Sequence, residues 1–327
     1  MKSVITMGDP NGVGPEILLK AYLEGKFPSN SFVVGDISVL RFCSKKIGLN
    51  VPFHICSHDN LKENVLNVFD MNIMQESDIE IGKISHKSGA ASFEYIREAS
   101  KMVIEKKADA IITLPVNKKA IMLTHPDFIG HTELIADMCG VSDYAMMIAS
   151  DKLITTYVTT HLPIKDVVKF IKKERIFRVI TLTDEVTKAL RGFAKIAIVA
   201  LNPHAGEEGA FGDEEINEIK PAIEMAKKNG YDVYGPIPPD TVFFRAMRGD
   251  FNAVVCMYHD QGHIAMKFSG VDDGVNVTLG LPIIRTSVDH GTAFDIAYQG
   301  KASILSFLNA CKMAEKIFKY RSRIEKA

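Results

Sequence analysis

Residues 195–201 read Lys-Ile-Ala-Ile-Val-Ala-Leu, and Asn202-Pro203-His204 follows directly. Apolar side chains at successive positions are typical of a strand that is buried on both faces of a parallel sheet. Similar short β-rich runs alternate along the chain with longer segments of helical periodicity, such as 90–107 and 214–229. This alternation predicts α/β layers around a mainly parallel sheet. In the second helical segment we expect one buried face, made of Ile216, Ile219, Ile223 and Ala226.

The charge balance of the 327-residue chain is close to neutral, with 39 lysines and arginines against 40 aspartates and glutamates. Bulk electrostatic attraction to nucleic acid or to an anionic membrane is therefore excluded as the main activity. No apolar run is long enough to span a bilayer, and Asp9 interrupts the N-terminal apolar residues. The five cysteines are scattered without a CxxC pair, so we expect a reduced, cytoplasmic protein with structural thiols.

Three predicted strands are each followed closely by a histidine: His161, His204 and His259. Ligands of open α/β sheets gather beyond the carboxyl ends of the strands, so these positions are candidates for a site. Three imidazoles with an open fourth position could form a catalytic site for zinc or a related divalent ion. The alternative is that each histidine is a structural residue that hydrogen-bonds to nearby backbone.

Further polar residues occupy positions where the fold alone does not require them. The segment 8–16 is a glycine-rich strand-to-helix stretch, which is either a phosphate-binding turn or a tight turn alone. Thr132, in Gly-His-Thr-Glu at 130–133, is either a ligand residue or a helix N-cap. Lys267, Asn276 and Arg285 lie in a stretch rich in glycine and aliphatic residues. The two cations could hold phosphate or carboxylate, or could be plain surface charge.

Together these motifs resemble the 4-hydroxythreonine-4-phosphate dehydrogenase family of pyridoxal phosphate biosynthesis. The resemblance runs from the first strand to about residue 305, and five segments carry it in order: Gly-Asp-Pro-Asn-Gly-Val-Gly-Pro-Glu at 8–16, Gly-His-Thr-Glu at 130–133, Leu-Asn-Pro-His-Ala-Gly-Glu at 201–207, Tyr-His-Asp-Gln-Gly at 258–262 and Thr-Ser-Val-Asp-His-Gly-Thr-Ala at 286–293. The resemblance implies an isocitrate/isopropylmalate dehydrogenase-like α/β fold, with two α/β/α domains and a cleft between them. We expect a discontinuous domain of residues 1–115 plus 285–327, and a second domain of 116–284 that carries the metal ligands and dimer contacts.

The activity implied by the resemblance is NAD- or NADP-dependent oxidation and decarboxylation of 4-phosphooxy-L-threonine to 3-amino-2-oxopropyl phosphate. It implies one divalent ion per site (zinc, magnesium or cobalt), bound by His161, His204 and His259. It also implies a homodimer with shared sites, in which His259 comes from the partner subunit. Substrate contacts are implied for His131, Thr132, Lys267, Asn276 and Arg285, with Lys267 also catalytic. By analogy with the fold, we expect the segment 286–299 to form a nucleotide-binding loop.

Two carboxylates are candidates for orienting the histidines: Asp240, in Pro-Pro-Asp-Thr, and Asp260, next to His259. Three competing functions stay open. A sibling dehydrogenase of a phosphorylated sugar acid, such as 4-phosphoerythronate or threonate, would have nearly the same site. A metal-dependent hydrolase would leave the segments 8–16 and 286–299 without a purpose. A non-catalytic metal- or metabolite-binding protein would not need the lysine, arginine and histidine set.

Overall fold

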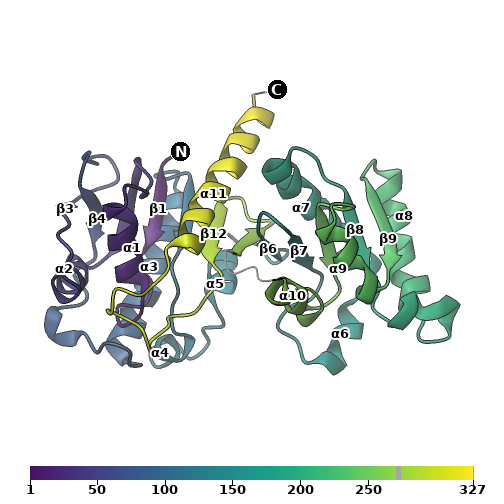
Figure 1. Cartoon of the computed structure of the whole chain (residues 1–327), viewed down its shortest axis with the longest axis horizontal. Helices are drawn as coiled ribbons and strands as arrows, with labels where there is room; N and C mark the ends of the chain where they lie inside the picture. Colours follow the sequence, from purple (N-terminus) through teal and green to yellow (C-terminus); the bar gives the residue numbers. More distant parts are fainter. Residues whose placement is uncertain (270–273, 327) are drawn as a thin grey trace. The chain divides into compact units, whose positions relative to one another are not determined.

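The computed structural model describes residues 1–269 and 274–326. The chain forms two compact units, one of Met1–Ser142 with Leu281–Phe318 and one of Asp143–Gly280 with Lys319–Ala327. Figure 1 shows how the last strand, β12 (Ile284–Val288), returns to the unit that holds the first strands of the chain. Within the described residues, no helix is both long and apolar enough to cross a membrane.

The sheet of the first unit has the strand order β3-β4-β2-β1-β5-β12. Every pairing in this set is parallel, and Ser3 of β1 lies beside Ser31 of β2 and Ala110 of β5. The carboxyl ends of its strands therefore meet at one edge. The strand bounds are β1 (Ser3–Thr6), β2 (Ser31–Gly35), β3 (Phe53–Ile55), β4 (Leu66–Asp70) and β5 (Ala110–Thr113).

The helices of this unit follow its strands along the chain. They are α1 (Gly14–Leu23), α2 (Ile37–Lys46), the short η1 (Glu76–Asp78), α3 (His86–Ile104), α4 (Lys118–Met122) and α5 (His131–Met138), and α11 (Leu305–Ile324) begins here. Helix α3 starts where the Ser85 hydroxyl accepts a hydrogen bond from the backbone amide of Ser88, a standard N-cap. The apolar face of α3, which includes Tyr95 and Ala99, is fully buried.

The sheet of the second unit has the order β11-β6-β7-β10-β8-β9. Strand β6 runs antiparallel to both of its neighbours, and the pairings from β7 to β9 are parallel. The apolar run 195–201 contains strand β8, which lies between β10 and the edge strand β9, and residues 196–200 are entirely buried. The bounds are β6 (Ala145–Ala149), β7 (Ile154–Tyr157), β8 (Ile196–Val199), β9 (Val233–Ile237), β10 (Ala253–Cys256) and β11 (Val275–Leu279). The predicted α/β fold with mainly parallel sheets is confirmed.

The helical elements of this unit are α6 (Ile164–Phe170), α7 (Lys173–Arg191), η2 (Pro203–Gly209), η3 (Glu215–Ile219), α8 (Lys220–Lys228), α9 (Pro239–Met247) and α10 (His259–Phe268). One expectation for this region is wrong, because Ile216 is 43% exposed while Ile219, Ile223 and Ala226 are buried. The segment opens with a π-helical turn, η3, whose wider winding shifts Ile216 out of phase with the buried face.

Candidate functional site

The three predicted metal ligands follow three neighbouring parallel strands of the second unit. Strand β10 lies between β7 and β8, and these strands lead into His259, His161 and His204 respectively. Since parallel strands end at the same edge of a sheet, the topology delivers all three histidines to one edge. Sequence order alone could not show this adjacency.

Two of these histidines lie together. The ring centroids of His161 and His259 are 5.7 Å apart, and His263 stacks on His259 at 3.9 Å with an interplanar angle of 12°. Helix α10 can pack this closely on Tyr157 because residue 262 is glycine: a Cβ there would lie 2.8 Å from the Tyr157 ring. His263 was not predicted, although its spacing of four residues from His259 places both on one helical face.

The His259 ring is oriented by its neighbour in the sequence. Asp260 Oδ1 lies 2.7 Å from His259 Nδ1, so this nitrogen is engaged and Nε2 is the one left for a metal ion. The second carboxylate proposed for this role lies elsewhere: Asp240 is exposed and accepts a hydrogen bond from the adjacent Thr241 hydroxyl at 3.3 Å. The geometry thus gives Asp260, rather than Asp240, a contact with a predicted ligand.

His204 stands in an unusual turn. Residues 204–208 all have positive φ, and the φ of His204 is 52°. Such a run of left-handed residues costs free energy, so it persists only where surrounding contacts hold it. The buried Glu215 carboxylate holds the residues just before this turn: it accepts hydrogen bonds from the amides of Leu201 at 2.7 Å and Asn202 at 2.8 Å.

The His204 ring contacts the Phe211 ring, at 6.5 Å between centroids. Within the described parts of the chain, no three metal-ligating side chains gather in one group. A divalent ion fits the donor set in part, because imidazole nitrogens suit zinc and related ions and Asp260 fixes one ring. One chain therefore presents a histidine pair, His161 with His259, and a third histidine on the neighbouring strand end.

The first unit holds a buried arginine. Arg285, on β12, is 3% exposed and donates from Nη2 to the Thr113 hydroxyl at 2.8 Å and from Nη1 to the Thr132 hydroxyl at 3.3 Å. Burial lowers the pKa of Arg285 to about 10, and the nearby Glu133 carboxylate offsets part of the shift. The guanidinium is still protonated at neutral pH. Thr113 was not predicted, although it closes a strand and so lies at the functional edge of the sheet.

The N-terminus of α5 places His131 and Thr132 beside this arginine. The N-cap position is Gly130, so the alternative reading of Thr132 as the N-cap is wrong, and its hydroxyl instead accepts from Arg285. Burial, followed by the charges of Arg285 and Lys118, lowers the pKa of His131 well below its ordinary value. His131 Nε2 is buried and has no hydrogen-bond partner among the described residues. A neutral imidazole, two hydroxyls and a guanidinium thus meet here.

The other two predicted substrate residues belong to the second unit. Lys267 is exposed in the last turn of α10, and Asn276 lies on β11 in register with Ile148 of β6. The first unit therefore gathers His131, Thr132 and Arg285 around one point, and the second unit carries Lys267 and Asn276.

The glycine-rich segment 8–16 is a packed turn. Its amides bind protein acceptors: Gly12 N donates to Asp9 O at 3.0 Å, and Val13 N donates to Thr292 O at 3.0 Å. A Cβ on Gly14 would lie 2.1 Å from Met7 O, so this glycine permits close backbone packing. These contacts favour the tight-turn reading over the phosphate-binding one.

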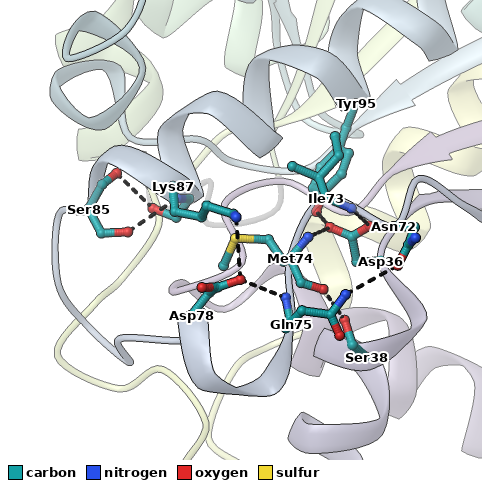
Figure 2. Close-up of polar contacts among 11 residues, drawn as sticks. Asp36, Ser38, Asn72, Ile73, Met74, Gln75, Asp78, Ser85, Lys87 and Tyr95 are labelled. Atoms are coloured by element: carbon teal, nitrogen blue, oxygen red, sulfur yellow. Dashed lines mark hydrogen bonds and ion pairs between the residues drawn. The ribbon is translucent and has the colours of Figure 1, made fainter.

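Two buried carboxylates follow β1 and β2. Burial raises the pKa of Asp9 to about 6, although hydrogen bonds from Asn11, Ser88 and Asn117 offset part of the rise. Asp36 accepts hydrogen bonds from the amides of Ile73 and Met74, each at 2.8 Å, and from the Tyr95 hydroxyl (Figure 2). Both oxygens of Asp36 thus hold the loop after β4, which gives this carboxylate a structural role.

An α/β fold with histidines at one sheet edge and a buried arginine beside a helix N-terminus is typical of α/β enzymes, whose polar groups gather at the carboxyl ends of their strands. The comparisons are more specific: residues 28–314 match the family model described as pyridoxal phosphate biosynthetic protein PdxA. The chain belongs to this family.

Relatives of this chain have two names. It is 42% identical to D-threonate 4-phosphate dehydrogenase of Salmonella typhimurium, over 96% of this chain and 98% of that protein. It is also 42% identical to 4-hydroxythreonine-4-phosphate dehydrogenase of Geobacter metallireducens, over 96% of this chain and 94% of the relative. A crystal structure of 4-hydroxythreonine-4-phosphate dehydrogenase from Klebsiella pneumoniae superposes with a TM-score of 0.85 at 38% identity, covering 97% of this chain and 99% of that one.

Proposed function

We propose that this protein is a dehydrogenase that oxidises the 3-hydroxyl group of a four-carbon, 4-phosphorylated hydroxy acid, with NAD or NADP as hydride acceptor. The observation that carries the proposal is the buried Arg285, held between the Thr113 and Thr132 hydroxyls next to His131. A buried cation with hydroxyl and imidazole partners suits a phosphate ester. The names of the relatives supply the reaction class.

In this proposal a divalent ion would be held by His161, His204 and His259. When bound, such an ion supplies Lewis-acid chemistry, which lowers the pKa of a hydroxyl group and favours negative charge on oxygen. Asp260 keeps Nε2 of His259 directed away from its own carboxylate. Arg285, Thr132 and His131 bind and orient the phosphate end, so the hydroxyl end of the substrate is positioned by contacts remote from the reacting carbon.

The overall reaction balances with the cofactor. The C3 hydride passes to the nicotinamide and the hydroxyl proton is released, which leaves a β-keto acid. The C1–C2 bond then breaks, C1 leaves as carbon dioxide and C2 takes up a proton, so that 4-phosphooxy-L-threonine gives 3-amino-2-oxopropyl phosphate. A phosphorylated sugar acid would give the analogous ketone with a hydroxyl in place of the amino group. Lys267 and Asn276 are proposed as further substrate contacts, with Lys267 also catalytic.

For the nucleotide we propose the segment 286–299, whose first three residues end β12 and whose remainder is the loop that follows this strand. This loop lies beyond the carboxyl end of a parallel strand, where cofactors of α/β proteins bind. Two contacts anchor it on the segment 8–16: Tyr298 donates to Pro10 O at 2.6 Å, and Val13 N donates to Thr292 O at 3.0 Å. Its tip, His290-Gly291, is exposed and so accessible to a ligand.

The amino acid ester is the first substrate of the proposal, and D-threonate 4-phosphate is the second candidate. A specific observation favours the second candidate: relatives at 39 to 44% identity are named as dehydrogenases of D-threonate 4-phosphate. Initial rates with each ester, NAD or NADP and a divalent ion test both. If nicotinamide is reduced with neither ester, the proposal is contradicted. Turnover of a phosphoester without nicotinamide would favour the interpretation as a hydrolase.

We further propose a homodimer whose metal ligands come from both subunits. Two features support it. No group of three metal-ligating side chains forms within the described residues of one chain. In addition, α10, which begins at His259, exposes Ile264 to 67% and Phe268 to 94%, and apolar surface of this kind suits an interface between subunits.

A further inference from the structure

Lys118 is a cation near the proposed phosphate site that the sequence analysis did not assign. It is the first residue of α4, and the Asn117 side chain fixes that helix start by accepting a hydrogen bond from Ala120 N at 3.0 Å. Lys118 follows the carboxyl end of β5 by a few residues, and β5 ends at Thr113, the hydroxyl partner of Arg285. One strand end therefore supplies both residues.

The ammonium group of Lys118 lies over the start of α5. A Cβ built on Gly130, the residue before α5, would be 3.5 Å from Lys118 Nζ and 2.7 Å from Glu133 Oε2. The charge of Lys118 also affects His131, because Lys118 and Arg285 are the two cations that lower the pKa of that imidazole. The positive charges of Lys118 and Arg285 therefore both lie near His131 and Thr132.

The charge of the expected ligand favours a second cation among the residues of the first unit. A phosphate monoester carries nearly two negative charges at neutral pH. Of the three residues that the first unit gathers at this point, His131 is neutral, Thr132 is uncharged and only Arg285 is a cation. The Glu133 carboxylate adds further negative charge nearby. With Arg285 alone, the site would hold a dianion with a single positive charge.

We propose that Lys118 is the second cation of the phosphate site and binds the phosphate group of the substrate from the α4 side. This inference rests on the proposed function, since it assumes that the phosphate lies between Arg285 and the start of α5. As a flexible, exposed lysine, Lys118 acts as a point charge, whereas Arg285 is fixed by its two threonine partners.

The test measures binding of inorganic phosphate to the full-length protein by isothermal titration calorimetry at low ionic strength. Lys118→Met removes the charge and keeps the apolar stem, Lys118→Arg keeps the charge, and Lys119→Met removes the exposed neighbouring lysine of the same helix as a matched control. Arg285→Gln reports on the site itself. Circular dichroism and urea unfolding of each variant check that it folds.

We expect Lys118→Met to weaken phosphate binding about tenfold, and Lys118→Arg and Lys119→Met to stay within about twofold of the parent. The loss should shrink at high ionic strength, because exposed charges are screened. If Lys118→Met keeps the parental affinity for phosphate while Arg285→Gln binds it more weakly, Lys118 is not part of the site, and the phosphate site itself still stands. Parental affinity in both variants would also remove the phosphate site, and with it the proposed function. If the parent binds free phosphate too weakly to titrate, the KM of the phosphorylated substrate takes the place of the affinity, with the same expectations.

Discussion

Arg285 and Thr113 lie 172 positions apart in the chain, and Nη2 of the arginine donates to the threonine hydroxyl at 2.8 Å. The contact follows from strand order, because β12 pairs in parallel with β5 and places Arg285 beside Ile111, from which the side chain reaches Thr113. A buried guanidinium is costly unless its N–H groups are satisfied. Thr113 and Thr132 therefore fix the position of this cation as well as lowering its cost.

The first prediction concerns this contact. Thr113→Val removes the hydroxyl at nearly constant volume, so Arg285 loses a fixed partner. We expect the KM for the phosphorylated substrate to rise about tenfold, in line with a lost hydrogen bond to a charged group, with a smaller change in kcat. Thr113→Ser keeps the hydroxyl and should stay close to the parent. Equal KM values for the valine and serine variants would remove Thr113 from the site.

The second prediction concerns the orientation of His259. Asp260→Asn replaces the carboxylate on His259 Nδ1, and we expect affinity for a divalent ion to fall about tenfold or more. Asp240→Asn is the matched control, because its contact is with Thr241, and it should keep the parental affinity. Competition with a chromogenic chelator measures both. The reverse order, with Asp240→Asn the weaker binder, would show that the wrong carboxylate has been assigned.

The third prediction is a pH dependence of stability caused by Asp9. Its pKa is raised to about 6 in the folded protein from 3.8, so the folded state holds this proton more tightly than the unfolded state. The free energy of unfolding should therefore fall as pH rises from about 4 to about 6, by about 2 kcal/mol from this group.

Asp9→Asn should remove that part of the pH dependence, as followed by urea unfolding at several pH values. Asp240→Asn controls for removing an exposed carboxylate and should leave the parental curve in place. A curve for Asp9→Asn that falls as steeply as that of the parent would show that the folded protein does not shift the titration of Asp9.

The fourth prediction tests the sharing of ligands between subunits. His161→Ala and His259→Ala proteins should each be inactive as homodimers. In a heterodimer of the two, one site would have both defects and the other none, so activity should return to about half of the parental value. Affinity tags on the two chains allow the heterodimer to be isolated. An inactive heterodimer would mean that His161 and His259 serve the same site from one chain, which their centroid distance of 5.7 Å would also allow.

The sequence was most informative where the position of a residue depends only on the strand to which it belongs or which it follows. The apolar run 196–201 predicted β8, and the strand ends located His161, His204 and His259, because both signals are local. Contacts that depend on strand order were not predictable from one sequence. Thr113 contacts Arg285 only because β5 and β12 are neighbouring strands. In the same way, His161 lies near His259 only because β7 and β10 are neighbouring strands.

One local error and one alternative that the sequence left open have physical causes. Ile216 was placed on the buried face by helical periodicity of 3.6 residues, which the π-helical turn η3 breaks. The segment 8–16 has glycines for backbone packing, and a glycine-rich pattern alone does not separate that need from phosphate binding. The amide partners in the folded chain make the distinction.

The central claim is that this protein transfers hydride from a 4-phosphorylated hydroxy acid to nicotinamide. The most direct measurement is the formation of reduced nicotinamide, followed by its near-ultraviolet absorbance, with each phosphorylated ester and with its unphosphorylated counterpart under the same conditions. We predict turnover that needs the phosphate group and that Arg285→Gln reduces at least about tenfold in kcat/KM through KM. Absence of reduced nicotinamide with every phosphorylated ester, in a folded protein supplied with divalent ion, would contradict the claim.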